Sequence, residues 1–246
     1  MNMRILIVGC GDVGLRVARL LGGRARVYAL SHSPERFAEL RGAGVTPIPG
    51  NLDDRASLRR LRGLAPWVLH FAPPPGEGET DPRTRRLLAA LGCQPAAMTY
   101  ISTSGVYGDC GGARVAEPRP VRPANARAKR RADAEARLRA WGRRGHRVGI
   151  LRAPGIYARE RLPADRVRRG LPAIEVQDDV YTNHIHAEDL ARLAVAVLFR
   201  CRPNRVYNAV DDSGLKMGDW FDTVADHLAL PRPPRLPRQD VIAAVT

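Results

Sequence analysis

The chain has 246 residues, 44% of them hydrophobic, which suits one sizeable α/β domain or one domain with a small lobe attached. Its 40 lysines and arginines outnumber its 25 aspartates and glutamates and give a formal net charge of +15. Only Lys129 and Lys216 are lysines, and the arginines are dispersed over several segments with no interleaved aromatic residues. This pattern argues against nucleic acid as the partner and favours an anionic small molecule, such as a phosphate-bearing cofactor.

No segment of the sequence resembles a signal peptide or a membrane span. The longest apolar stretch, Ala187–Phe199, contains Glu188, Asp189 and Arg192 and is therefore typical of a helix in a soluble protein. We expect a cytoplasmic protein, monomeric or homodimeric, that contacts no membrane. Four cysteines lack the spacing of a metal site or redox pair, and we expect them to be reduced and metal-free: Cys10, Cys93, Cys110 and Cys201.

Short aliphatic runs alternate with helical patterns along the first part of the chain. Strands are expected, in chain order, at Arg4–Val8, Arg26–Leu30, Thr46–Ile48, Trp67–Ala72, Met98–Ser102 and Arg147–Leu151. The intervening helices are expected at Val13–Leu21, after a Ser33 cap, from Asp53 or Asp54 to Leu61, from Asp81-Pro82 to about Gly92, and at Ala124–Trp141. Alternation at this pace predicts right-handed βαβ units and a doubly wound parallel sheet, the Rossmann fold.

The pattern loosens beyond Arg152. Two helices, Glu188–Phe199 and Met217–Leu228, flank a short strand at Val206–Ala209, and a proline-rich tail follows. We therefore expect a dinucleotide-binding domain over residues 1–152. Residues 153–246 are expected to form a small C-terminal substrate lobe packed on it, with some segments returning to the core.

A glycine-rich turn joins the first expected strand to the first expected helix. Gly9-Cys10-Gly11-Asp12-Val13-Gly14 has the spacing G-x-G-x-x-G. The first glycine permits the tight turn, the second lets the backbone approach a pyrophosphate, and the third lets helix and strand pack closely. The free N–H groups at the helix N-terminus would then face the phosphates, so we expect Gly9, Gly11, Asp12, Val13 and Gly14 to bind the cofactor.

The end of the second expected strand bears on the choice between NAD and NADP. An NAD-specific site usually places an acid there, about 20 residues after the glycines, to hold the ribose 2′-hydroxyl. This chain has no acid directly at the strand end, and instead offers Ser31, His32, Ser33 and Arg36. These side chains favour NADP over NAD, although Ser33 also fits a helix cap and Arg36 an ordinary surface arginine.

Longer segments resemble the extended short-chain dehydrogenase/reductases, specifically the nucleoside-diphosphate-sugar epimerase/dehydratase group. The resemblance is carried by Tyr100-Ile-Ser-Thr-Ser-Gly-Val-Tyr-Gly108, Gly50-Asn-Leu-Asp53, His70-Phe-Ala72, Leu151-Arg-Ala-Pro-Gly-Ile-Tyr157, Asn183-His-Ile-His-Ala-Glu-Asp-Leu190 and Tyr207-Asn-Ala-Val-Asp-Asp212. They span nearly the whole chain in the order of the group. The resemblance implies further cofactor contacts at Asn51, Leu52, Phe71, Ala72, Pro73, Ser102 and Pro154.

The same resemblance implies a catalytic set of Ser/Thr, Tyr and Lys. Thr103 lies at the Ser/Thr position with Ser104 beside it, and Lys129 lies at the lysine position, where it would hold the nicotinamide ribose. The tyrosine position holds Asn125, whose amide donates hydrogen bonds but does not exchange protons usefully. The glycine turn also departs from the group's usual G-x-x-G-x-x-G, so the chain is similar to an atypical branch.

Two functions are compatible with these residues. The first is an NADP- or NAD-dependent oxidoreductase or epimerase for a small polar or nucleotide-sugar substrate, with Thr103 and Asn125 polarising the substrate oxygen. The second is a non-catalytic NAD(P)-binding redox sensor or regulator. Asn125 is the residue that separates them.

Overall fold

The computed structural model describes residues 3–93 and 95–245, and the chain divides into two compact units. The first, here called the sheet unit, comprises the residues up to Cys110 together with Arg114–Ala153 and Ala187–Ala209. The second, here called the small unit, comprises Gly111–Ala113, Pro154–His186 and the residues from Val210 onward. The chain therefore leaves the sheet unit after Ala153 and returns to it for one helix and one strand.

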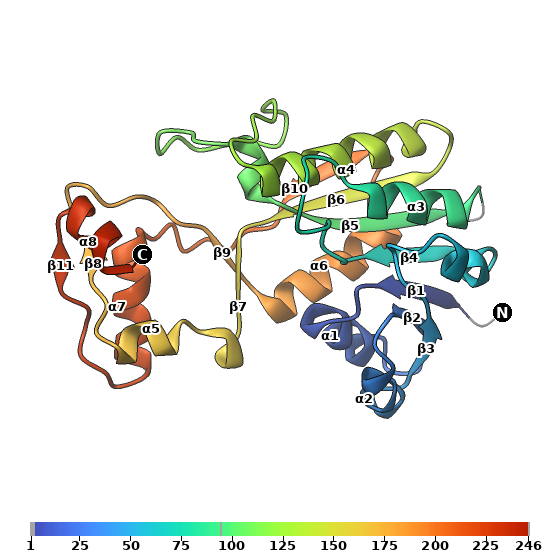
Figure 1. Ribbon diagram of the computed structural model, residues 1–246, viewed down its shortest axis with the longest axis horizontal. Coiled ribbons are helices and arrows are strands. Elements are labelled where there is room, and N and C mark those ends of the chain that lie inside the picture. The colour runs from blue at the N-terminus through green and yellow to red at the C-terminus, as the bar shows by residue number, and fades with distance from the viewer. Residues whose placement is uncertain (1–2, 94, 246) are drawn as a thin grey trace. The chain divides into compact units, whose positions relative to one another are not determined.

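A seven-stranded sheet forms the centre of the sheet unit (Figure 1). Its strands are β1 (Arg4–Val8), β2 (Arg26–Ser31), β3 (Val45–Pro49), β4 (Trp67–His70), β5 (Ala97–Thr103), β6 (Arg147–Ala153) and β10 (Arg205–Asn208). They are arranged in the order β10-β6-β5-β4-β1-β2-β3, and every neighbouring pair is parallel. This confirms the predicted doubly wound Rossmann-type sheet.

Helices cover both faces of this sheet (Figure 1). On one face, η2 (Ala56–Leu61), α3 (Pro82–Leu91) and α4 (Ala126–Gly142) contribute leucines and Trp141 to the main core cluster. On the other face, α6 (Ala187–Arg200) packs against β4, β5 and β6 and against α1 (Asp12–Leu21). The strands are aliphatic on both sides because neither face meets water, and Ile5 to Val8 of β1 are each 0% exposed.

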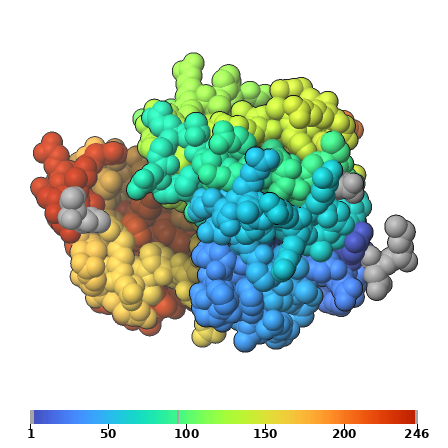
Figure 2. All heavy atoms as spheres, turned by 45° about the vertical axis from the view of Figure 1, so that its right-hand side comes forward, coloured from blue at the N-terminus to red at the C-terminus, as the bar shows by residue number. Residues whose placement is uncertain are grey.

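The edge beside β3 is completed by η1 (Pro34–Arg36) and α2 (Phe37–Gly42), which packs against that strand. In Figure 2 the blue and cyan segments of the sheet unit form one continuous surface. Side chains cap two helix starts: the Asp81 carboxylate accepts from Thr84 N–H at α3, where a helix start was predicted, and the Asn125 side chain accepts from Ala128 N–H at α4. The segment ending at Leu61 is a 3₁₀ helix, not the α-helix expected from its pattern.

The small unit is built from short elements. Its helices are η4 (Arg159–Arg161), α5 (Ala164–Arg168), α7 (Met217–His227) and α8 (Arg238–Val245). Two small parallel sheets pair β7 (Gly155–Tyr157) with β9 (His184–His186) and β8 (Ala173–Ile174) with β11 (Arg235–Leu236). Its core cluster buries Val167, Val224 and Ala225. Within the described part of the chain, no helix has the length and apolar character needed to span a bilayer.

Candidate functional site

The strand order reverses between β1 and β4, and in doubly wound sheets ligands bind at the carboxyl ends of the strands beside such a reversal. Val8 of β1 is paired with His70 of β4 at this edge. The N–H groups of Phe71 and Ala72 both donate to the Val8 carbonyl, at 2.7 and 2.9 Å. The chain after β4 is thereby fixed next to the glycine turn that follows β1.

Two of the three glycines in that turn are required by the protein itself. Gly9 has φ +86°, and a Cβ there would lie 2.4 Å from the backbone nitrogen of Ala72. A Cβ on Gly14 would lie 3.1 Å from Cys10 Sγ and 3.3 Å from Ile7, so this glycine allows α1 to pack closely on β1. Burial raises the pKa of the Cys10 thiol to about 11, and the sulfur acts as a neutral packing atom here.

Gly11 differs from the other two glycines. It is the N-cap of α1, its φ is −84°, and a Cβ placed on it would meet no protein atom within 4 Å. Neither the backbone nor the described neighbours therefore require glycine at this position. A side chain would extend into the open space in front of the first N–H groups of α1, where an anion is stabilised by the helix dipole. The residues present thus fit the pyrophosphate of a dinucleotide.

Other residues of the turn are already engaged within the protein. The Asp12 carboxylate accepts from Arg16 Nε at 2.8 Å, and Arg16 Nη1 reaches Glu188 of α6 at 2.6 Å. Val13 is 8% exposed and belongs to the core. Asp12 and Val13 are therefore suited to bind a phosphate through their backbone N–H groups and not through their side chains.

Among the predicted residues after β2, Arg36 contacts the glycine turn directly. Arg36 Nη1 donates to the Cys10 carbonyl at 3.0 Å, while its Nε donates to Glu39 at 2.9 Å. Ser33 N–H donates to Ser31 Oγ at 3.3 Å, and Ser33 Oγ lies 3.2 Å from His32 Nδ1. Ser33 is the N-cap residue of η1, but its hydroxyl makes no capping hydrogen bond.

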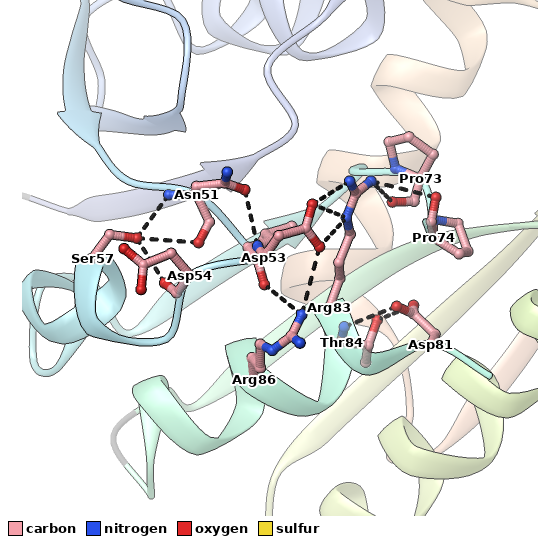
Figure 3. A network of polar contacts seen from close by, with 11 residues as sticks. Asn51, Asp53, Asp54, Ser57, Pro73, Pro74, Asp81, Arg83, Thr84 and Arg86 are labelled. Atoms are coloured by element: carbon pink, nitrogen blue, oxygen red, sulfur yellow. Dashed lines mark hydrogen bonds and ion pairs between the residues drawn. The ribbon is translucent and has the colours of Figure 1, made fainter. Parts of the chain in front are cut away.

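A network of polar contacts joins the loops that follow β3 and β4 (Figure 3). Arg83 of α3 makes a bidentate contact with the Asp53 carboxylate, and its Nη1 also donates to the carbonyls of Pro73 and Pro74. Arg86 of the same helix donates to the Leu52 carbonyl at 3.3 Å. The Arg83 guanidinium lowers the pKa of Asp53, so this carboxylate stays ionised at neutral pH.

The same network fixes the loop after β3. Asn51 Oδ1 accepts from Asp53 N–H, and Asn51 N–H donates to Ser57 Oγ, each at 2.9 Å (Figure 3). Leu52 is 8% exposed and packs in the core cluster. The structure therefore brings the predicted residues Asn51, Leu52 and Pro73 together on one side of the site.

The carboxyl end of β5 carries the predicted hydroxyl residues. Thr103 Oγ1 accepts from Gly105 N–H at 3.2 Å, and Ser104 opens η3 (Ser104–Tyr107) with a half-buried side chain. Ser102 points elsewhere: its hydroxyl donates to Glu135 of α4 at 2.6 Å. Thr103 and Ser104 are thus left as the hydroxyl groups available at this edge.

Glu135 also belongs to a buried ion pair. Arg152 of β6 donates to it from Nε at 3.1 Å and from Nη2 at 2.6 Å, and the two side chains are 3% and 4% exposed. A buried charge without its partner costs several kcal/mol, roughly 3–5. The pair therefore fixes α4 firmly against the ends of β5 and β6.

Two predicted residues of α4 make contacts other than those expected. Asn125 Oδ1 accepts from Ala128 N–H at 2.9 Å, so its amide oxygen is used to cap the helix. Lys129 Nζ pairs with Glu79 Oε1 at 2.5 Å, and both side chains are largely exposed. Pro154 belongs to the small unit, whereas the other predicted cofactor residues belong to the sheet unit.

The cation that reaches the sheet from α4 is Arg131, which is not among the predicted site residues. Its Nη1 donates to the Ile101 carbonyl at 2.8 Å and to the Tyr100 hydroxyl at 2.9 Å. The sequence feature that could have pointed to Arg131 is its position four residues before Glu135, because residues four apart lie on the same face of a helix. Lys129 is two positions earlier and therefore lies on a different face of the helix.

Beneath this edge lies a buried polar chain. The Thr84 hydroxyl donates to Asp81 at 2.6 Å and must therefore accept from His70 Nε2 at 2.8 Å. This places the imidazole proton on Nε2. Burial lowers the pKa of His70 to about 3, and the Arg131 charge adds to the effect, so the ring is neutral. Burial also raises the pKa of Tyr100 despite its contact with Arg131, so Tyr100 stays protonated.

Comparison with protein families matches residues 5–64 to the TrkA-N domain, an NAD-binding Rossmann domain, and no curated protein matches the chain. Among solved structures, a conserved protein of unknown function from Silicibacter pomeroyi is 27% identical with a TM-score of 0.81, over 97% of this chain and 83% of that one. The residues matched to the TrkA-N domain, 5–64, include the glycine turn and Ser31 to Arg36.

Two further structures have known activities. A dTDP-glucose 4,6-dehydratase from Streptomyces venezuelae with NAD bound is 21% identical with a TM-score of 0.78, over 97% of this chain and 86% of that one. A UDP-glucose 4-epimerase from Thermotoga maritima with UDP-glucose is 17% identical with a TM-score of 0.78, over 96% and 87%. The resemblance to the nucleotide-sugar epimerase/dehydratase group is thus confirmed at the level of the fold.

Proposed function

We propose that the protein is an NAD(P)-dependent oxidoreductase or epimerase that acts on a small polar or nucleotide-sugar substrate. The observation that carries this proposal is Gly11, a glycine required by no described protein atom and placed at the N-terminus of α1. The family match over residues 5–64 and the dehydratase with bound NAD support the same cofactor class. When bound, the nicotinamide would accept or donate a hydride.

The residues that follow different strands of the sheet would have different roles in binding and catalysis. Backbone N–H groups of α1 hold the pyrophosphate, and Phe71, Ala72 and Pro73 border the nicotinamide side. The hydroxyls of Thr103 and Ser104 orient the substrate oxygen at the end of β5. The buried His70 takes no proton from the substrate, because its ring is 1% exposed and burial lowers its pKa to about 3.

NADP is the preferred form in this proposal. No carboxylate follows β2 directly, and Arg36 contacts the Cys10 carbonyl within the glycine turn. An arginine beside this turn can accommodate a ribose 2′-phosphate, whereas an acid would repel it. Ser31 and Ser33 add hydroxyls on the same side.

The test compares Gly11→Ala with Gly42→Ala, since neither added Cβ would meet a protein atom within 4 Å. We expect Gly11→Ala to weaken NADPH binding by about tenfold or more, roughly 1.4 kcal/mol, while the urea midpoint is unchanged. Gly42→Ala should bind NADPH like the native protein. Fluorescence titration gives the dissociation constants, and the same titration with NADH measures the preference. Native affinity in Gly11→Ala would refute the proposed phosphate site.

A second function, a non-catalytic NAD(P)-binding sensor, is favoured by Asn125 and Lys129. One caps α4 and the other pairs with Glu79, so neither is free to move a proton at the substrate. NADPH consumption with a panel of aldehydes and ketones detects a net reductase, and product analysis of nucleotide sugars incubated with the protein and cofactor detects an epimerase, which consumes no cofactor overall; together they separate the two functions. Tight NADPH binding with no turnover on any of them would support the sensor.

A further inference from the structure

We infer that Arg131 binds a carboxylate of the substrate, which makes the substrate a sugar acid or another carboxylate-bearing hydroxy or oxo compound. This inference rests on the proposed function and names its substrate class. It starts from the guanidinium of Arg131, whose Nη1 is fully used by the Ile101 carbonyl and the Tyr100 hydroxyl. Its Nε and Nη2 donate to no atom in the part of the chain that the structure describes.

The free edge has the shape of a carboxylate receptor. The N–H groups of Nε and Nη2 point in parallel and form a planar fork that matches the two oxygens of a carboxylate. The two hydrogen bonds from Nη1 and the position of the guanidinium over the Tyr100 ring, 5.5 Å from its centroid, hold this fork in place. A preorganised donor pair loses less conformational entropy on binding than a mobile surface side chain would.

The charge of Arg131 is also unbalanced. Two other cations of α4 have carboxylate partners, since Lys129 pairs with Glu79 and Arg137 pairs with Asp133, while Arg130 donates to the Gly78 carbonyl. Among the described residues no carboxylate forms an ion pair with Arg131, although its side chain is half-buried. The positive charge of Arg131 acts on the buried His70, because it adds to the effect of burial in lowering the pKa of that ring. A partly desolvated cation of this kind is stabilised by an anionic ligand.

The position of the fork connects it to the reaction. Arg131 reaches the sheet at Tyr100 and Ile101, on the strand that ends at Thr103. Arg127 lies one helical turn earlier on the same face of α4 and is exposed. Arg131 and Thr103 thus lie toward the same end of β5, and the inference places an adjacent hydroxyl or carbonyl of the same molecule at Thr103 and Ser104.

Isothermal titration of the NADPH-saturated protein tests the inference with two pairs of probes. The pairs are UDP-glucuronate against UDP-glucose, and glucuronate against glucose, which differ by a carboxylate in place of a hydroxymethyl group. We expect at least one carboxylate to bind with a dissociation constant below about 10 mM and at least about tenfold more tightly than its neutral counterpart. Arg131→Gln should reduce that preference to less than about twofold.

Arg139→Gln is the matched control, because it removes one positive charge from the same helix and should keep the preference. Arg131→Lys retains the charge without the fork and should give an intermediate preference. The inference is overturned if neither carboxylate binds the NADPH-loaded protein, if the neutral probes bind equally well, or if the preference survives in Arg131→Gln. Because NADPH saturation is established first, each of these results leaves the cofactor proposal standing.

Discussion

His70 shows how a residue can be part of the site's framework without taking part in chemistry. Its ring is 1% exposed, and its Nε2 donates to Thr84, whose hydroxyl donates in turn to Asp81. The strand-end position of His70 suggests a proton carrier, but burial lowers its pKa to about 3 and keeps it neutral. Its remaining role is to connect β4 to the start of α3.

This burial predicts a pH dependence of stability. The unfolded chain protonates His70 below pH 6.5, whereas the folded protein does so only near pH 3. The unfolded state therefore binds more protons in this window, and the His70 contribution, complete above pH 6.5, is lost as the pH falls toward 3. His70→Gln should flatten the fall in the free energy of unfolding between pH 6 and 4 by up to about 1.4 kcal/mol per pH unit.

Urea denaturation of both proteins at several pH values measures this slope. His32→Gln is the control, because His32 is exposed and should leave the slope as it is. Parallel pH profiles for the native protein and His70→Gln would show that the imidazole is protonated in the folded state.

Residue contacts were the part of the site that the sequence predicted least well. The glycine turn could be placed because its spacing, strand and helix are all local features. The choice between Lys129 and Arg131 depends on which face of α4 meets β5, and that face shifts by about 100° for each residue of helix register. The helix begins at Ala126, two residues after the expected start, and its register follows from buried tertiary contacts such as those of Glu135 and Leu138.

At the scale of elements, the parallel strands were predictable because each is a short, continuously apolar run buried on both faces. The expected strand Arg4–Val8 has the observed bounds of β1, and Arg26–Leu30 differs from β2 by one residue. The strands of the small unit were not predicted. With two or three residues each, they are too short to show a periodicity, and only pairing with distant segments defines them.

Asn125 supports a prediction about the element that it begins. Its side chain satisfies the N–H of Ala128, one of the unpaired donors in the first turn of α4. Asn125→Ala should lower the free energy of unfolding by about 1 kcal/mol, because that donor loses its partner. Asn125→Asp should retain native stability, since a carboxylate accepts the same hydrogen bond and favours the helix N-terminus.

Urea midpoints of the three proteins provide the measurement. An Asn125→Ala protein as stable as the native one would mean that the amide does not cap the helix in solution. Asn125 would then be free to act at the substrate, as the resemblance first implied.

For the whole molecule, the two units differ in how much apolar surface they bury. The sheet unit has a seven-stranded sheet between helices, and one core cluster of this unit includes the fully buried side chains of Tyr100, Leu87 and Leu138. The core cluster of the small unit fully buries Val167, Val224 and Ala225, and its sheets have two strands each. Regions with few buried apolar contacts open at lower free energy than the core does.

We therefore expect hydrogen exchange to be uneven along the chain. Amides of α5 and α7 should exchange through openings of lower free energy than amides of β1 and β5, which are covered on both faces. NADPH at about 100 times its dissociation constant should add up to about 2.7 kcal/mol of protection to the core strands of the sheet unit, because the cofactor binds the folded glycine turn and not the unfolded chain. Openings of the small unit that leave the glycine turn intact should gain no such protection. Exchange followed by mass spectrometry, with and without NADPH, resolves these segments. Equal protection of α7 and β5 without cofactor would show that the two units unfold as one.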